Sequence, residues 1–184
     1  MTNVTFLMNQ ESFFVMNAVS KKNKYREYKR TMAALLVVIM VSAVIFINLF
    51  THVVTIVRYY GDAMEPSLSD GQVLVVLQTD NVKQGDMAAF YYNNQVIIRR
   101  IICEGDNQIT VEKDGMVVIN GEPFVESYTS NMSLGQCNID FPYYITPGHF
   151  FVMGDNRTIS MDSRLKEIGT VPQERIIGKV IFDI

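Results

Sequence analysis

The residues best suited to chemistry lie in one polar segment near the end of the chain, GDNRTISMDSR at positions 154–164. Asp162 and Arg164 carry opposite charges two positions apart, so we expect a charge-assisted pair that fixes this loop. Ser160 would then present its hydroxyl group to a neighbouring side chain. The alternative is a turn rich in glycine and asparagine with a surface ion pair, which would contribute little to stability.

Two further segments lie upstream, GDAMEPSL at positions 61–68 and IIRRIICEGD at positions 97–106. Together with the first segment they resemble the motif boxes of the type I signal peptidases of the Gram-positive type. These are Ser/Lys proteases that remove leader peptides from exported proteins. The closing segment, positions 169–180, is similar to the family's last strand, so the resemblance covers roughly residues 30–184.

Both positions that the family uses for catalysis hold unreactive side chains in this sequence. Ala63 stands where the resemblance places the serine nucleophile, and a methyl group has no lone pair with which to attack a carbonyl. Arg99 stands where the lysine general base is expected, and arginine stays protonated in proteins. Sliding the alignment by one residue supplies no base, because no lysine lies between Lys83 and Lys113.

The resemblance also implies supporting roles for other residues. Gly61 would help to build the oxyanion hole with backbone donors, and Ser160 would hydrogen-bond the catalytic base. Asp162, together with Arg164, would support that region. A third possibility is that another hydroxyl group acts as the nucleophile, and Ser67 is the nearest one. However, the position of Ser67 matches a serine or threonine of the family that is not the nucleophile.

In the family, substrate binds as an extended strand beside the segments that lead into the nucleophile and the base. Here these are residues 57–62 and 96–99, and main-chain pairing would supply the affinity. The residues expected in the groove or at its oxyanion end are the following: Gly61, Asp62, Met64, Ile97 and Ile98.

Two features of this groove have alternative interpretations. Tyr59 and Tyr60 are bulky for a pocket that takes small residues, or else they anchor at the bilayer surface, where tyrosine is favoured. Arg99 either leaves the groove open or pairs with Asp62 or Glu65 and closes it.

The function that the resemblance implies is therefore binding without cleavage. The partner would be an exported polypeptide or its signal peptide. If the chain is similar to the inactive family members that assist pilus assembly, the partner would be pilin or sortase. The alternative is a genuine signal peptidase I, a serine endopeptidase, whose nucleophile was replaced by Ala63. Arg99 argues against it, because the base would still be absent.

No cofactor, metal or nucleic acid is indicated. His52 and His149 stand far apart with no ligating residues beside them, and the net charge is −3. Cys103 and Cys137 could form a disulfide, but spacing alone cannot bring them into range, and two independent thiols are favoured.

A membrane anchor divides the chain. Residues 32–50 are nineteen residues without a charge, and as a helix they would span about 28 Å, which matches the apolar core of a bilayer. We expect a transmembrane helix over residues 31–57 rather than a buried helix of a soluble protein or a cleaved signal.

The charge distribution predicts the orientation of this anchor. Residues 1–30 carry six basic and two acidic side chains, whereas residues 51–184 carry ten basic and seventeen acidic ones. Basic flanks stay on the cytoplasmic side. We therefore expect a single-pass protein of the cell membrane, with a cytoplasmic tail over residues 1–30 and an extracytoplasmic domain over residues 58–184.

The outer domain reads as mainly β structure, with short and mostly antiparallel strands in a signal-peptidase-like sandwich or barrel. Apolar runs are punctuated by turn signals, among which Asn93-Asn94, Asp114-Gly115 and Asn120-Gly121 predict hairpins. The polar stretch 126–138 is predicted to be a mobile loop.

Overall fold

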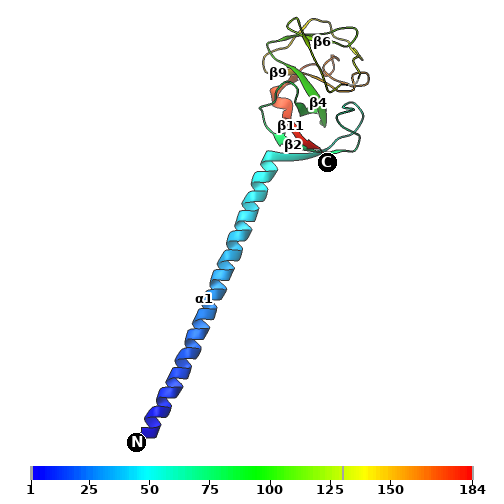
Figure 1. Cartoon of the computed structure of the whole chain (residues 1–184). Helices are drawn as coiled ribbons and strands as arrows, with labels where there is room; N and C mark the ends of the chain where they lie inside the picture. The colour runs from blue at the N-terminus through cyan, green and yellow to red at the C-terminus, as the bar shows by residue number, and fades with distance from the viewer. Residues whose placement is uncertain (1, 130, 184) are drawn as a thin grey trace. The chain divides into compact units, whose positions relative to one another are not determined.

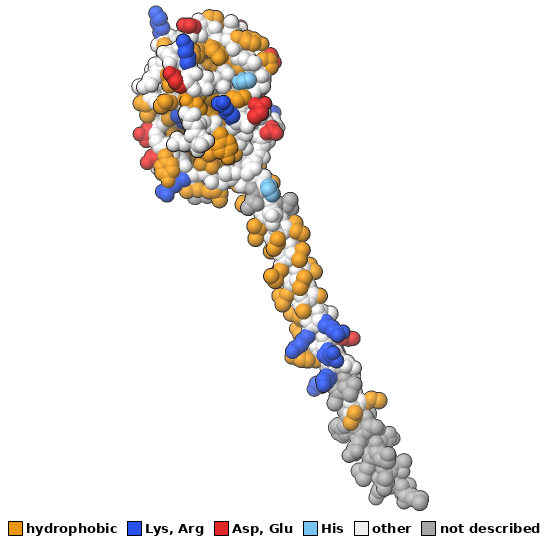
Figure 2. All heavy atoms as spheres, turned by 180° about the vertical axis from the view of Figure 1, so that it is seen from behind, with side chains coloured by type: hydrophobic (Ala, Val, Ile, Leu, Met, Phe, Trp, Pro, Cys, Tyr) orange, Lys and Arg blue, Asp and Glu red, His pale blue; other side chains and the backbone are white. Residues whose placement is uncertain are grey.

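The computed structural model describes residues 2–129 and 131–183 and separates the chain into two units, residues 1–50 and residues 51–184. Helix α1 (Thr2–Val53) accounts for the first unit and extends three residues into the second. Its segment Ser20–Asn48 is long and apolar enough to cross a membrane, and the most apolar stretch of 18 residues within it has a mean hydropathy of 2.5. Figure 2 shows basic side chains gathered on α1 beside this apolar stretch.

The predicted helix over residues 31–57 is too long at its C-terminal end. The helix ends at Val53, and Val54–Arg58 form strand β1, which pairs with β2 (Val73–Gln78). An apolar run rich in valine, isoleucine and threonine does not by itself distinguish helix from strand. The pairing partner in β2 decides the matter, because it satisfies the backbone groups of β1 on one side.

The second unit is built from two antiparallel sheets, as predicted for the outer domain (Figure 1). The larger sheet has the strand order β1-β2-β11-β3-β4-β9-β10. Its remaining strands are β3 (Met87–Tyr92), β4 (Gln95–Glu104), β9 (His149–Met153), β10 (Val171–Pro172) and β11 (Ile176–Asp183), with the short helix η1 (Gln173–Arg175) between the last two. The smaller sheet has the order β7-β6-β5-β8, formed by β5 (Gln108–Val111), β6 (Val117–Ile119), β7 (Glu122–Phe124) and β8 (Tyr143–Tyr144).

The turn signals in the sequence are confirmed. Asn93 and Asn94 both have positive φ angles, 47° and 60°, as a two-residue hairpin turn requires, and they join β3 to β4. Asn120 and Gly121 likewise have positive φ angles and join β6 to β7.

Strand β4 connects the parts of the domain. In Figure 1 it runs between the region of β2 and β11 and the region of β6. Its residues Ile98, Ile101 and Ile102 belong to three different buried apolar clusters. A β-bulge between Ile101 and Cys103 breaks the two-residue alternation, which allows successive side chains here to be buried. The segment that carries Arg99 is therefore held in a rigid part of the fold.

Two other sequence predictions concern the cysteines and the segment 126–138. Cys103 and Cys137 are separate free thiols, as favoured. The mobility of segment 126–138 stays a prediction, but two of its described residues contact the loop 154–164. Buried Glu126 binds Arg157, and the Thr129 hydroxyl donates a hydrogen bond to the carbonyl of Asp155 at 2.8 Å.

Candidate functional site

Three buried arginine–carboxylate pairs hold the polar loop 154–164 in place. The predicted pair of Asp162 and Arg164 is confirmed, with Nε–Oδ1 and Nη2–Oδ2 distances of 2.8 and 2.7 Å. Both side chains are fully buried, so the alternative of a surface turn is wrong. Asp162 also accepts a hydrogen bond from the backbone N–H of Gly154 at 3.0 Å, which ties the two ends of the loop together.

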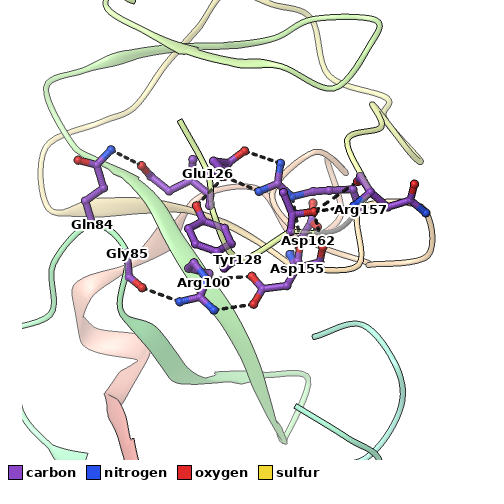
Figure 3. Close-up of polar contacts among 12 residues, drawn as sticks. Gln84, Gly85, Arg100, Glu126, Tyr128, Asp155, Arg157 and Asp162 are labelled. Carbon is purple, nitrogen blue, oxygen red and sulfur yellow. Dashed lines mark hydrogen bonds and ion pairs between the residues drawn. The ribbon is translucent and has the colours of Figure 1, made fainter. Parts of the chain in front are cut away.

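The second pair joins this loop to β4. Arg100 donates to both carboxylate oxygens of Asp155, at 2.8 and 2.5 Å, and its Nη1 donates to the carbonyl of Gly85 at 2.8 Å. The guanidinium also lies over the ring of Tyr128, 4.1 Å from its centroid, as Figure 3 shows. The Arg100 side chain therefore has a structural role, because these contacts hold the loop to β4.

The third pair, between Arg157 and Glu126, could not be read from the motif. Both nitrogens at the end of Arg157 donate to the Glu126 carboxylate, which also accepts from the Tyr128 hydroxyl at 2.5 Å (Figure 3). Burial and this carboxylate raise the pKa of Tyr128. The one available signal is that residues 154–164 hold only two carboxylates, Asp155 and Asp162, which pair with Arg100 and Arg164 and leave none for Arg157.

Ser160 has the most unusual environment in the loop. Its hydroxyl is fully buried and has no hydrogen-bond partner among the described residues. An unsatisfied buried hydroxyl costs about 1–3 kcal/mol. The expectation that Ser160 meets a neighbouring side chain is therefore not met in this chain, because Arg99 directs its donors elsewhere.

Arg99 is 8% exposed and bonds to backbone carbonyls. Its Nε donates to Met161 at 2.9 Å and its Nη1 donates to Ile98 at 2.7 Å. Burial lowers the pKa of the guanidinium, and the nearby Asp162 carboxylate opposes that change. Arginine starts from such a high pKa that it stays charged. The predicted alternative of an ion pair with Asp62 or Glu65 is wrong, since Arg99 has no carboxylate within ion-pair distance in the described structure.

Ala63 lies where the loop 154–164 meets the segment 61–68. Its carbonyl accepts a hydrogen bond from the N–H of Asn156 at 3.0 Å. A β-carbon on Gly154 would lie 2.4 Å from the Ala63 carbonyl oxygen and 2.2 Å from the Ser160 hydroxyl oxygen. Glycine is therefore required at position 154, because any side chain there would push the two motif segments apart.

Donors next to Ala63 are occupied by the chain itself. The N–H of Gly61 donates to the carboxylate of Asp70 at 2.7 Å, and the N–H of Met64 donates to the hydroxyl of Tyr59 at 2.9 Å. Tyr59 is buried in the core, and burial raises the pKa of its hydroxyl. Tyr59 therefore does not anchor at a bilayer surface, whereas Tyr60 is 71% exposed.

Three hydroxyl groups in or near the motif segments make no hydrogen bond to a lysine amine among the described residues. The Ser67 hydroxyl accepts a hydrogen bond from Arg100 at 3.2 Å, the Tyr59 hydroxyl accepts from a backbone N–H, and Ser160 has no partner. None of the three meets the amine of a lysine. A base that removes a proton must lie within hydrogen-bond reach of it.

A groove of about 490 Å³ runs beside these residues. It lies between residues 57–60 and residues 95–99, and its lining consists of Val57, Arg58, Tyr59, Tyr60, Gln95, Val96, Ile97, Ile98 and Arg99. Ile97 and Ile98 line this groove, and their role toward a substrate stays a prediction. Asp62 does not line the groove, and Met64 is fully buried in the core below it.

Both walls of the groove have free strand edges. β1 is the outermost strand of its sheet, and β9 pairs with β4 only from Arg100 onward. Backbone groups alternate between the two sides of a strand. Since Tyr59 bonds to the side of β2, the N–H and C=O groups of Tyr60 face the groove. By the same alternation the N–H and C=O groups of Val96 face it on the other wall, whereas the carbonyl of Ile98 is bonded by the Arg99 guanidinium.

Comparison with known proteins identifies the family. A family model described as signal peptidase, peptidase S26, matches residues 29–184. The chain belongs to the signal peptidase family.

Relatives in this signal peptidase family are similar over most of their length. Signal peptidase I T of Bacillus subtilis is 33% identical over 178 residues, which cover 90% of this chain and 88% of the relative. Signal peptidase IB of Staphylococcus aureus is 28% identical over 174 residues, or 84% of this chain and 90% of the relative. The crystal structure of a signal peptidase I from Enterococcus faecalis is 26% identical, with a TM-score of 0.44 over 55% of this chain and 97% of the solved one.

Proposed function

We propose that this signal peptidase family member binds an exported polypeptide in the groove and does not cleave it. The family's activity is the cleavage of signal peptides from exported proteins. The observation that carries the proposal is a preserved groove and loop framework with Ala63 and Arg99 at the two positions that would perform the chemistry. Peptide hydrolysis by a Ser/Lys dyad needs an attacking oxygen and a neutral amine.

Affinity would come from the two free strand edges. An extended peptide between Tyr60 and Val96 could pair with both walls, which is the usual way in which a strand is added to a sheet edge. The apolar side chains of Val57, Ile97 and Ile98 in the lining would contact alternate side chains of the peptide. Neither contribution depends on a serine.

The membrane anchor would place the domain where exported chains emerge. Helix α1 contains one segment fit to cross a bilayer, preceded by a basic cluster. We infer a cytoplasmic N-terminus and an outer β domain from the rule that basic flanks stay inside. Signal peptides are the partners that the family suggests, and pilin or sortase are more specific partners whose co-purification with the tagged protein would support an assembly role.

The proposal is tested by binding and cleavage measured together. The full-length protein in detergent should bind a labelled leader peptide and leave it intact, as followed by fluorescence anisotropy and mass spectrometry. Val96→Pro removes the N–H group that faces the groove, and proline is tolerated at a strand edge. We expect this variant to melt near the parent's temperature and to lose binding.

Val96→Ala is the matched control, because it shortens the same side chain and keeps the N–H group. Its affinity should stay close to that of the parent. Cleavage by the parent protein that disappears in Val96→Pro would contradict the proposal. Equal binding by Val96→Pro and Val96→Ala would show that the strand edge is not used.

A further inference from the structure

The groove carries positive charge in a domain that is acidic overall. Two of its lining residues, Arg58 and Arg99, are cations, and no lining residue is acidic. The surrounding residues 51–184 have ten basic and seventeen acidic side chains. Of the nearby carboxylates, Asp70 is engaged by the N–H of Gly61, and Asp62 is exposed outside the lining. A cationic groove on an acidic domain favours an anionic group in its ligand.

Arg99 differs from the other buried arginines of the domain. Arg100, Arg157 and Arg164 each bind a buried carboxylate, whereas Arg99 is almost as buried and binds only neutral carbonyls within the described structure. A guanidinium has five N–H donors in a planar fork suited to a carboxylate. The bonds to Met161 and Ile98 use Nε and Nη1, and Nη2 takes part in neither.

The sheet also limits where a bound peptide can end. The free edge of β4 stops short of Arg100, because Arg100 pairs with Met153 of β9 and the Arg99 guanidinium already bonds to the carbonyl of Ile98. A peptide strand that runs along this edge in the direction of β4 must end or turn away there. If the peptide ends, its terminal group lies beside the Arg99 guanidinium. That terminal group is a carboxylate, which supplies the missing negative charge.

We propose that the groove is a receptor for peptides that end in a free carboxylate, with Arg99 as the residue that binds this group. This inference rests on the proposed function, because it assumes that an extended peptide occupies the groove. The ligand class is the released end of a cleaved chain rather than an intact one. With Arg99 in place of the family's lysine, the site that would bind an intact peptide bond would instead bind the carboxylate released by its hydrolysis.

The test compares one labelled peptide in two forms. A short peptide of small and apolar residues ending in alanine is made as the free acid and as the C-terminal amide. Binding to the full-length protein is measured by anisotropy. We expect the acid to bind about tenfold more tightly, the effect of a charge-assisted bidentate contact. In Arg99→Gln this ratio should fall to about one.

Arg58→Gln is the control for general electrostatic attraction, since Arg58 lies on the same groove but is exposed. It should keep most of the acid preference. Loss of the preference to the same degree in both variants would overturn the assignment of Arg99. Equal binding of the acid and the amide to the parent would overturn the carboxylate site and leave the proposed function standing. Binding of neither peptide would overturn both.

Discussion

At the scale of single residues, the chemistry of the site is decided by two side chains and by what surrounds them. Ala63 cannot attack a carbonyl, and Arg99 cannot accept a proton. The other residues of the motif in loop 154–164 are present. The Ser160 hydroxyl has no partner among the described residues, and the family resemblance implies that it would bind the catalytic lysine. From the family resemblance we expect that a lysine at position 99 would meet this hydroxyl.

Reversion of the two reactive positions tests this interpretation. Ala63→Ser alone should give no cleavage of a leader peptide, because the base is still a charged guanidinium. Ala63→Ser combined with Arg99→Lys should give detectable cleavage, since a buried lysine can lose its charge and Ser160 can bind it. Release of the cleaved peptide is followed by mass spectrometry.

Ser160→Ala in the double-reversion background is the control for this experiment. It should abolish the recovered cleavage and leave the fold intact, because the hydroxyl makes no bond in the parent. Cleavage by the single Ala63→Ser variant would favour a genuine peptidase in which only the nucleophile was replaced.

A second prediction at this scale concerns the buried pair of Glu126 and Arg157. Glu126→Gln leaves a buried guanidinium without its counter-charge, so the free energy of unfolding should fall by about 3 kcal/mol or more. Glu122→Gln, on an exposed strand position, should change it by less than about 0.5 kcal/mol. Urea titration of both variants measures the difference, and equal stabilities would show that the pair contributes little.

At the scale of elements, strand β11 must pass very close to its neighbour β2. A β-carbon on Gly178 would lie 1.8 Å from the carbonyl oxygen of Leu77, and the register of β11 is irregular at this point. Gly178→Ala should therefore destabilise the domain by about 3 kcal/mol, at the upper end of overpacking costs. The same titration as for Glu126 reports this change.

Gly121→Ala is the matched control at this scale. Gly121 also has a positive φ angle, 87°, but a β-carbon there would meet nothing within 4 Å. Only the backbone strain of about 1 kcal/mol should appear. If both glycine variants lose the same free energy, the contact with Leu77 is not what restricts position 178.

At the scale of the whole molecule, stability should depend on pH in the alkaline range. Burial raises the pKa of the Cys103 thiol from its ordinary value of 9.0 to about 11, and burial also raises the pKa values of Tyr59 and Tyr128. The unfolded chain loses these protons first. The contribution of these three groups to the free energy of unfolding should therefore be fully present at neutral pH and fall as the pH rises from 9 toward 11.

Thermal melting across this pH range measures the effect, with Cys103→Ala as the comparison. Because the variant has no thiol to ionise, its loss of stability between pH 9 and 11 should be smaller than that of the parent. An identical pH profile for both proteins would show that Cys103 makes no such contribution.

The sequence by itself determined the family boxes, the alanine and arginine at positions 63 and 99, the apolar anchor segment and the hairpins. These are properties of residue type and short spacing, which local patterns record directly. Asn93-Asn94 predicts its turn because both residues tolerate positive φ angles.

Only the tertiary structure decided which distant groups meet. Val54–Arg58 became a strand because β2 offered a partner, and Glu126 became buried because Arg157, thirty-one positions away, needed a counter-charge. Tyr59 entered the core below Ala63, and Arg99 turned to backbone carbonyls rather than to Asp62 or Glu65. Such contacts depend on competition among many partners in a packed interior, and no local pattern records that competition.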